Sequence, residues 1–193
     1  MIPALMTMII IMLCGLLPAL NIVSEKEIGT IEQINVTPVN KAAFILSKLI
    51  PYWLMGFIIL TICFILAALV YGYTPKGSFL TIYAIAILFV LVMSGIGLII
   101  SNYAGTMQQS LFMMFFFMMI FMLMSGLFTD VRSMPDWAQD IAIFNPPRYF
   151  IDTMRSVFLK GGNMVDNIHN FNMLFVFAIM INAWAILSYR KQV

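Results

Sequence analysis

Apolar stretches separated by short polar segments make up most of the chain, and five of them are long enough to cross a lipid bilayer. A transmembrane helix needs about 20 apolar residues to span roughly 30 Å of hydrocarbon. Because unpaired backbone groups are costly in lipid, such stretches must form helices there. We therefore predict one all-α domain, residues 1–193, that is a polytopic transmembrane helix bundle. Its spans are expected at about residues 2–23, 44–73, 79–100, 111–128 and 171–187.

The polar segment after the first span has a helical pattern of its own. Ser24 and Glu27 have the spacing of a capping box, in which the hydroxyl and the carboxylate satisfy backbone N–H groups at the start of a helix. Isoleucines follow at every third position, and Pro38 cannot continue a helix. The pattern predicts a short amphipathic helix at about residues 25–36, with Glu25 and Glu27 in its first turn, where the helix dipole favours acids.

A second polar segment, at about residues 129–170, precedes the last span. Apolar positions recur there at helical spacing in two runs, and Gly161-Gly162 is typical of a helix end. We expect two short interfacial helices, with Trp137 and Tyr149 at the level of the lipid headgroups. Arg148, Asp152 and Arg155 are three or four positions apart and should share one helix face.

Small residues recur every fourth position at Gly97, Ser101 and Gly105. Such a spacing allows two helix backbones to approach closely. It predicts a packing face, either within the chain or between subunits.

The stretch "MQQSLFMMFFFMMIFMLM" is rich in methionine and phenylalanine. Methionine adapts to variable apolar partners. The stretch therefore fits either a pathway for an amphipathic or lipid-like substrate or a surface that faces lipid and neighbouring helices.

Composition supports the membrane class and narrows the possible functions. Hydrophobic residues make up 63% of the chain and charged residues 9%, whereas soluble domains carry about 25% charged residues. A net charge of +2 gives no reason to expect nucleic-acid binding. The spans contain no carboxylate and no histidine, which argues against an intramembrane enzyme. With one histidine and no GxxxxGK[ST] motif, we expect neither a metal centre, nor a P-loop, nor a directly bound cofactor.

The distribution of basic residues bears on orientation. If residues 24–48 and the C-terminus share one side, each side receives five Lys or Arg residues. Those closest to span ends, including Lys41, Lys48 and Arg190, favour a cytoplasmic location for residues 24–48. Five spans then place the N-terminus outside, where an upstream span would normally deliver it. We therefore expect an N-terminal part to precede this sequence.

The charge of the connector is unusual for a helix that simply lies on headgroups. It carries three acids and one base, so the anionic cytoplasmic leaflet would repel it. An acidic amphipathic helix also fits a docking surface for a basic groove of another protein. Both interpretations, docking helix and interfacial helix, follow from the residues.

Two segments resemble the ABC-2 family of permeases, the membrane domains of ABC exporters. The run "EKEIGTIEQINVTPVNKAAFILSKLIPYW" is similar to the first cytoplasmic connector of that family, and "SGLFTDVRSMPDWAQDIAIFNPPRYFIDTMRSVFLKG" resembles its outer segment before the last span. The matching connector positions are Glu27, Gly29, Thr30, Glu32, Ile34, Thr37, Pro38, Lys48, Pro51 and Tyr52.

The resemblance implies candidate functional residues at both ends of the bundle. The connector would act as a coupling helix that rests on a separate ATPase subunit, through Glu25, Lys26, Glu27, Gly29, Thr30 and Glu32. The outer segment would form a lid over the exit side, or a simple interfacial clamp, through Trp137, Pro147, Arg148, Tyr149, Asp152 and Arg155.

The function implied is that of a permease subunit of an ABC-type exporter in the cytoplasmic (inner) membrane. ATP would be hydrolysed by the partner ATPase, and a second permease subunit, identical or different, would complete the transporter. The family usually has a first span and an extracytoplasmic domain before the position of Ile2. The alternatives are a truncated, inactive permease fragment and a channel or scaffold without an energy source.

Overall fold

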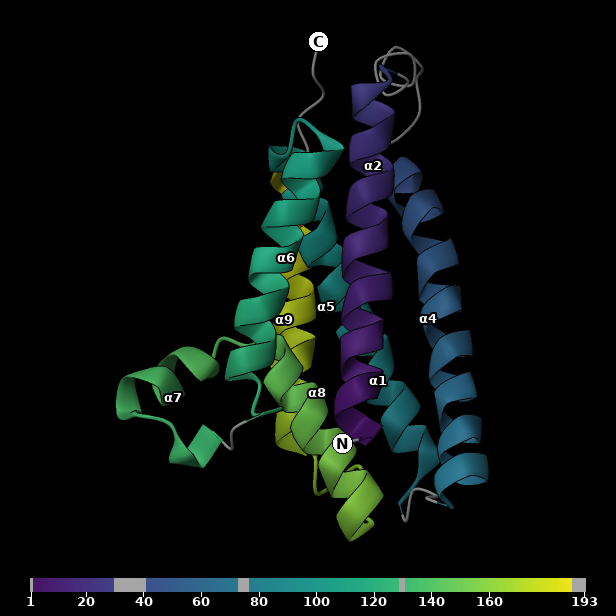
Figure 1. The fold of residues 1–193 in the computed structure, drawn as a ribbon, viewed down its shortest axis with the longest axis vertical. Helices are drawn as coiled ribbons and strands as arrows, with labels where there is room; N and C mark the ends of the chain where they lie inside the picture. Colours follow the sequence, from purple (N-terminus) through teal and green to yellow (C-terminus); the bar gives the residue numbers. More distant parts are fainter. Residues whose placement is uncertain (1, 30–40, 73–76, 129–130, 189–193) are drawn as a thin grey trace.

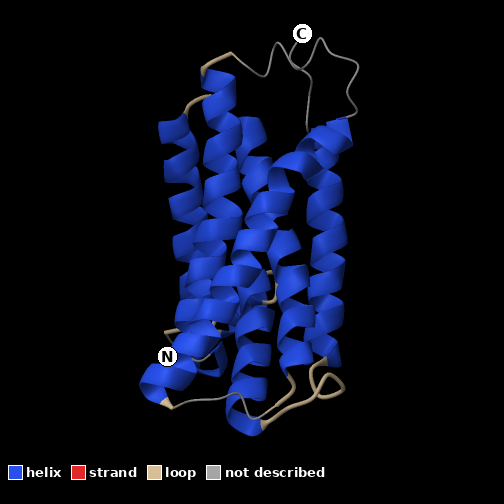
Figure 2. Cartoon of the chain, turned by 90° about the vertical axis from the view of Figure 1, so that its right-hand side faces the viewer, coloured by secondary structure: helices blue, strands red, loops and turns tan. Residues whose placement is uncertain are grey.

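The computed structural model describes residues 2–29, 41–72, 77–128 and 131–188. Throughout these residues the regular structure is helical, as predicted, and Figure 2 shows the long helices lying side by side. Among the described residues, five helices are long and apolar enough to cross a membrane, and each overlaps one predicted span. They run over Pro3–Glu27, Ile45–Val70, Phe79–Tyr103, Met107–Met124 and Ile168–Ser188.

The first membrane helix is one continuous rod made of three parts. Helix α1 (Ile2–Ile11) leads through a π-helical segment, Met12–Leu16, into α2 (Leu17–Glu27). The residues at both junctions keep right-handed helical dihedral angles, so the rod does not break. Figure 1 shows α1 and α2 in line along the length of the bundle.

Helix α5 (Phe79–Tyr103) forms the centre of the bundle. In its most apolar window 72% of the residues are buried inside the protein, against 17–22% for α4 (Lys41–Tyr71), α6 (Met107–Met124) and α9 (Ile168–Ser188). The latter three helices therefore present most of their apolar surface outward, as lipid-facing helices do.

Small residues set the distance between α5 and its neighbours. A Cβ added to Gly97 would lie 2.4 Å from the carbonyl oxygen of Gly15, and one added to Gly95 would lie 2.8 Å from Ile181 of α9. The packing face predicted from Gly97 is therefore within the chain. It joins the central helix to the first rod at the π-helical segment.

Ser24 does not begin a new helix, so the capping-box prediction is wrong. Residues 24–27 are the last turn of α2, and the chain leaves the helix at Gly29, whose φ is +81°. Nothing before Glu27 interrupts the helical geometry, and contacts with three other helices hold this turn in place. The rest of the predicted connector helix, up to residue 36, lies outside the described residues, as do Thr30 and Glu32.

The predicted pair of short helices before the last span is present as α7 (Asp136–Ala142) and α8 (Pro146–Arg155). Helix α7 projects sideways from the bundle in Figure 1. Its Trp137 is 66% exposed, which agrees with the prediction for an interfacial helix.

Helix α8 differs from the interfacial helix that we predicted. Its apolar face is buried against α1, α5 and α9, and Phe150 stacks on Phe89 of α5 with ring centroids 4.3 Å apart. Tyr149 is 5% exposed, so it does not lie on the surface as expected for a headgroup-level residue. The amphipathic pattern was correct, but the apolar face meets protein rather than lipid.

We predict that Gly97→Ala destabilises the bundle. The added methyl group meets backbone of the first rod, which cannot move aside as a flexible side chain could. Overpacking of this kind costs about 1–3 kcal/mol. Thermal unfolding of the purified protein in detergent, followed by tryptophan fluorescence, measures the effect.

Gly105→Ala is the matched control, because its added Cβ would lie 3.7 Å from the nearest atom, which is ordinary contact. Equal melting temperatures for the two variants would contradict the close contact between the first rod and α5.

Candidate functional site

The last turn of α2 brings three consecutive charged residues, Glu25, Lys26 and Glu27, to one end of the bundle. Each of them contacts a different neighbouring helix. We refer to these three residues and their partners as the connector clasp, because residues 28–40 follow directly.

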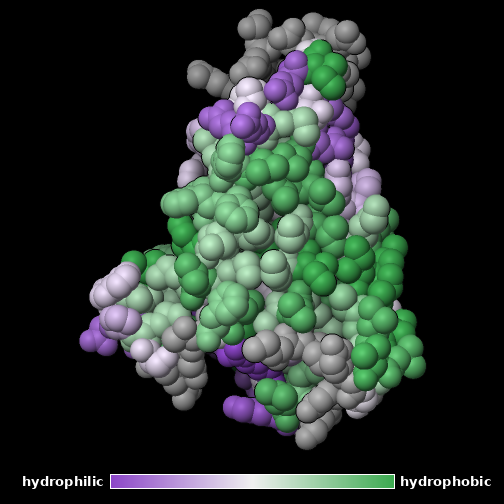
Figure 3. Space-filling model, viewed as in Figure 1, coloured by the Kyte–Doolittle hydropathy of each residue, from purple (hydrophilic) through white to green (hydrophobic). Residues whose placement is uncertain are grey.

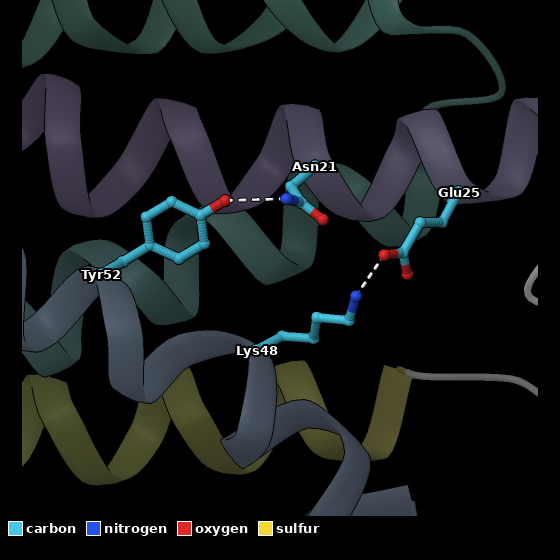
Figure 4. Close-up of polar contacts among 4 residues, drawn as sticks. All are labelled: Asn21, Glu25, Lys48 and Tyr52. Atoms are coloured by element: carbon cyan, nitrogen blue, oxygen red, sulfur yellow. Dashed lines mark hydrogen bonds and ion pairs between the residues drawn. The ribbon is translucent and has the colours of Figure 1, made fainter.

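Glu25 ties α2 to α4. Its carboxylate forms an ion pair with the Lys48 ammonium, and both side chains are partly buried, 22% and 30% exposed. One turn away on both helices, Asn21 Nδ2 donates a hydrogen bond to Tyr52 Oη over 2.9 Å. Figure 4 shows these two contacts side by side along the α2–α4 seam. The predicted acid thus has an intramolecular partner.

Lys26 contacts the C-terminal end of α5. Its ammonium donates to the backbone carbonyls of Ser101 and Asn102, the latter over 3.4 Å. Carbonyl groups in the last turn of a helix lack intrahelical partners, and a cation there interacts favourably with the helix dipole. Asn102 Nδ2 in turn donates to the Ala185 carbonyl of α9 over 3.2 Å, which extends the network to the last helix.

Glu27 contacts the N-terminal end of α6. Its Oε2 accepts a hydrogen bond from the Met107 backbone N–H over 3.1 Å. The N-cap hydroxyl of Thr106 accepts a second one from the Gln109 N–H over 3.2 Å. Anionic groups at a helix N-terminus satisfy free N–H groups and interact favourably with the dipole.

The sign of the dipole effect within α2 itself is opposite to our prediction. Glu25 and Glu27 were expected in a first turn, where acids are favoured, but they lie in a last turn, where acids are disfavoured. Contacts with Lys48 and Met107 offset this cost. The charges therefore serve packing between helices.

Gly29 marks the point where the chain leaves the clasp. Its φ of +81° is a conformation that other residues rarely adopt, and its N–H donates to the Lys26 carbonyl over 3.1 Å. Ile28 beside it is 76% exposed, which is unusual for a large apolar side chain at the polar end of a bundle.

The candidate residues at the opposite end occupy different positions on α7 and α8. Trp137 is exposed on α7, whereas Pro147 and Tyr149 are buried. Arg148, Asp152 and Arg155 line one cleft, so the prediction that they share a face is confirmed.

Two residues of this end also bond to backbone carbonyls. Arg155 Nη2 donates to the Gly126 carbonyl, just beyond the end of α6, over 2.8 Å. Tyr149 Oη donates to the Ile143 carbonyl over 2.8 Å. Burial raises the pKa of the Tyr149 phenol, with Arg148 opposing and Asp152 adding to the effect. The phenol therefore stays neutral and able to donate.

Some contributing residues were missed by sequence reasoning. Asn145, between α7 and α8, donates from Nδ2 to the Phe121 carbonyl of α6 over 2.9 Å. Asn182, in the middle of α9, donates to the Leu91 carbonyl of α5 over 3.0 Å. For Asn182, an amide side chain within an apolar span was the available signal, because such a group needs a partner in lipid.

The connector clasp consists of contacts between helices. Within the described ranges, no group of three or more His, Cys, Asp or Glu side chains could hold a metal ion. The clasp joins the end of one rod to three helices, α4, α5 and α6.

Comparisons with known proteins match this architecture to transporters. A family model described as ABC-2 type transporter matches residues 1–159. The chain is 31% identical over 183 residues to the probable multidrug ABC transporter permease YbhS of Escherichia coli (strain K12), which covers 93% of the chain and 48% of that protein.

Two further relatives from the same strain are similar. The probable multidrug ABC transporter permease YbhR is 29% identical over 163 residues, with 84% of the chain and 44% of that protein covered. The inner membrane transport permease YhhJ is 24% identical over 188 residues, with 95% of the chain and 50% of that protein covered. The chain thus spans about half the length of the curated relatives it matches.

The ion pair between Glu25 and Lys48 should show as an energetic coupling. We expect Glu25→Gln and Lys48→Met each to lower stability, and the double variant to cost less than their sum by about 1–2 kcal/mol. Chemical unfolding in mixed micelles measures the four free energies.

The combination of Glu25→Gln with Arg155→Met is the control, since it also removes one acid and one base. Arg155 lies at the other end of the bundle, so these two effects should add. Additive effects in the Glu25–Lys48 pair as well would show that the ion pair contributes nothing.

Proposed function

Because this chain belongs to the ABC-2 type transporter family, we propose that it forms a membrane-spanning part of a permease driven by a separate ATPase subunit. The relatives YbhS and YbhR are named as ABC transporter permeases. The sequence contains no P-loop motif, which fits an ATPase on another chain or domain. Under this proposal the chain is a transport subunit that does not itself hydrolyse ATP.

The connector clasp is the observation that carries the proposal. A partner that moves the segment after Glu27 would pull on α4 through Glu25, on the end of α5 through Lys26 and on the start of α6 through Glu27. A motor outside the bilayer needs such a rigid link, because a flexible tether would dissipate the displacement.

The rod formed by α1 and α2 offers a route to the far end of the bundle. Its backbone contacts α5 where Gly15 meets Gly97, and α1 contacts α8 at the other end. A tilt of the rod about this close contact would displace α8 in the opposite sense. We propose that nucleotide-driven closure of the ATPase shifts the bundle between two such arrangements, as in other rigid-body switches.

Under this proposal the predicted coupling residues have two different roles. Glu25, Lys26 and Glu27 make intramolecular contacts, which suits residues that transmit force. Docking on the ATPase is proposed for the segment that begins at the exposed Ile28 and includes Gly29, Thr30 and Glu32. An acidic and apolar segment fits a basic groove with an apolar floor.

The surroundings proposed for the protein follow from its surface. Large apolar side chains are exposed along α4, α6 and α9, and the middle of the molecule in Figure 3 is almost uniformly hydrophobic. We propose that lipid covers most of this surface and that a second permease subunit, identical or different, covers part of it. The name of the relative YhhJ supports an inner-membrane location.

An apolar groove on the side of the bundle suggests a class of cargo. It lies between α5, α6 and α9, has a volume of about 670 Å³ and includes Phe117, Phe121, Phe177 and Trp184. YbhS and YbhR are named as probable multidrug permeases. We propose apolar or amphipathic compounds that enter this groove from the bilayer.

Charge reversal at Glu32 and at Glu27 distinguishes the residue proposed for docking on the ATPase from the residue proposed to transmit force to α6. We expect Glu32→Lys to weaken co-purification of the partner ATPase while leaving the melting temperature unchanged. Glu27→Lys should instead lower the melting temperature, because it places a cation at the N-terminus of α6. Unchanged co-purification with both substitutions combined would contradict docking through the connector.

Loss of the Lys26 contact should uncouple the two subunits without separating them. We expect Lys26→Met to retain the bound ATPase but to lower ATP-dependent transport roughly fivefold, since a charge at a helix end contributes about 1 kcal/mol. Transport of a fluorescent amphipathic dye into inverted vesicles, with ATPase activity measured in parallel, tests this. Wild-type transport by this variant would exclude the α5 end from the coupling route.

A further inference from the structure

A polar cleft opens at the end of the bundle opposite the connector clasp. Its volume is about 440 Å³. In Figure 3 hydrophilic surface gathers in the hollow near the lower end, below the apolar flank. We name it the basic cleft, because three of the four ionisable residues that line it in the described part of the chain are cationic. The lining residues are Gly126, Val131, Arg148, Asp152, Arg155, Ser156, Leu159 and Lys160.

The backbone around the basic cleft is held firmly. Helix α8 buries Phe150, Ile151 and Met154 on its other face, so it cannot rotate its charged face away from the cleft. The helical segment Ser156–Lys160 follows without a break and ends at Gly161, whose φ is +70°. The cleft is therefore a preformed feature of the fold.

The cationic groups are placed to receive an anion. Arg155 is oriented by the Gly126 carbonyl, which uses one of its five N–H donors and leaves others for a ligand. Asp152 supplies the one carboxylate among these lining residues, and a single carboxylate can balance only one of the three cations. With Asp152 the four ionisable groups carry a net charge of +2.

We propose that the basic cleft binds a phosphate group through Arg148, Arg155 and Lys160. The planar guanidinium fork matches the oxygens of phosphate, and lysine adds a compact positive charge. The cleft borders Gly126, just beyond the end of the span α6, and the phosphates of a bilayer lie near the ends of membrane spans. The phosphate belongs either to an anionic phospholipid headgroup or to a free phosphate ion. This proposal does not rest on the transport function.

The test uses the purified full chain in nanodiscs, with three variants. Arg148→Gln combined with Lys160→Gln removes two of the cations, and Asp152→Asn removes the acid of the cleft. Asp140→Asn is the matched control, because it removes an exposed acid from α7, outside the cleft. Thermal unfolding confirms that each variant is folded.

Two measurements identify the source of the phosphate. Native mass spectrometry counts phosphatidylglycerol retained from nanodiscs that contain it beside phosphatidylcholine. Titration calorimetry in nanodiscs of phosphatidylcholine alone measures binding of inorganic phosphate. Retention of phosphatidylglycerol assigns the site to a lipid headgroup, and calorimetric binding of inorganic phosphate assigns it to the free ion. Either result supports the proposal if the variants change binding as described below.

The variants must change binding in opposite directions. We expect the arginine–lysine double variant to weaken it roughly 10- to 30-fold, since each basic residue near a membrane surface contributes about 1 kcal/mol. Asp152→Asn should tighten it, and Asp140→Asn should leave it unchanged. Absence of binding in both assays would overturn the proposal. An Asp140→Asn effect as large as that of Asp152→Asn would also overturn it, because the general surface charge would then explain the change in binding. If the double variant does not fold, the comparison of Asp152→Asn with Asp140→Asn tests the proposal: tighter binding only in Asp152→Asn supports it, and equal binding of the two variants overturns it.

Discussion

The backbone groups at helix ends need partners, and in this protein charged side chains from neighbouring helices supply them. The spans α5 and α6 and the turn between them contain no charged residue. Lys26 meets the carbonyls at the end of α5, Glu27 meets an N–H at the start of α6, and Arg155 meets a carbonyl beyond the end of α6. Each charge has the sign that the helix dipole favours. The neutral hairpin is thus fixed at both ends of the bundle by charges that other elements carry.

These ties give the first rod a special position. Its last turn contacts α4, α5 and α6, its middle touches the backbone of α5 at Gly97, and its first turns contact α8. The π-helical segment contains Gly15, which contacts Gly97, and such segments are common at functional sites. The first rod therefore connects the two regions predicted from the sequence to be functional, the connector at one end and the outer segment at the other.

Much of the fold could be predicted from the sequence, because hydrophobic length and periodicity are local properties. Five spans, two short helices before the last span and a helix end at Gly161 all followed from them. The start of the connector helix did not. A serine followed three residues later by glutamate signals a helix start only if the preceding residues are not helical, and α2 already continues through Ser24.

The site was harder to predict than the fold, because its contacts join distant parts of the chain. Glu27 meets the N–H of Met107, and no local pattern reveals such a partner. For the same reason the acids of the connector looked exposed and available. The periodicity of α8 identified an amphipathic helix, but periodicity cannot tell whether an apolar face will meet lipid or, as Phe150 does, an aromatic ring of α5.

The charge-free stretch from Gly77 to Thr129 also has a meaning for how the protein is made. Membrane insertion reads the basic residues that flank each span to decide which way the span enters. The α5–α6 hairpin contains no basic residue that could set its orientation, so the segments translated before and after it determine which way it enters the membrane. Lys26 and Lys48 ahead of the hairpin and Arg155 behind it tie helices of the finished bundle together, and they are also among the basic residues available to orient the hairpin during insertion.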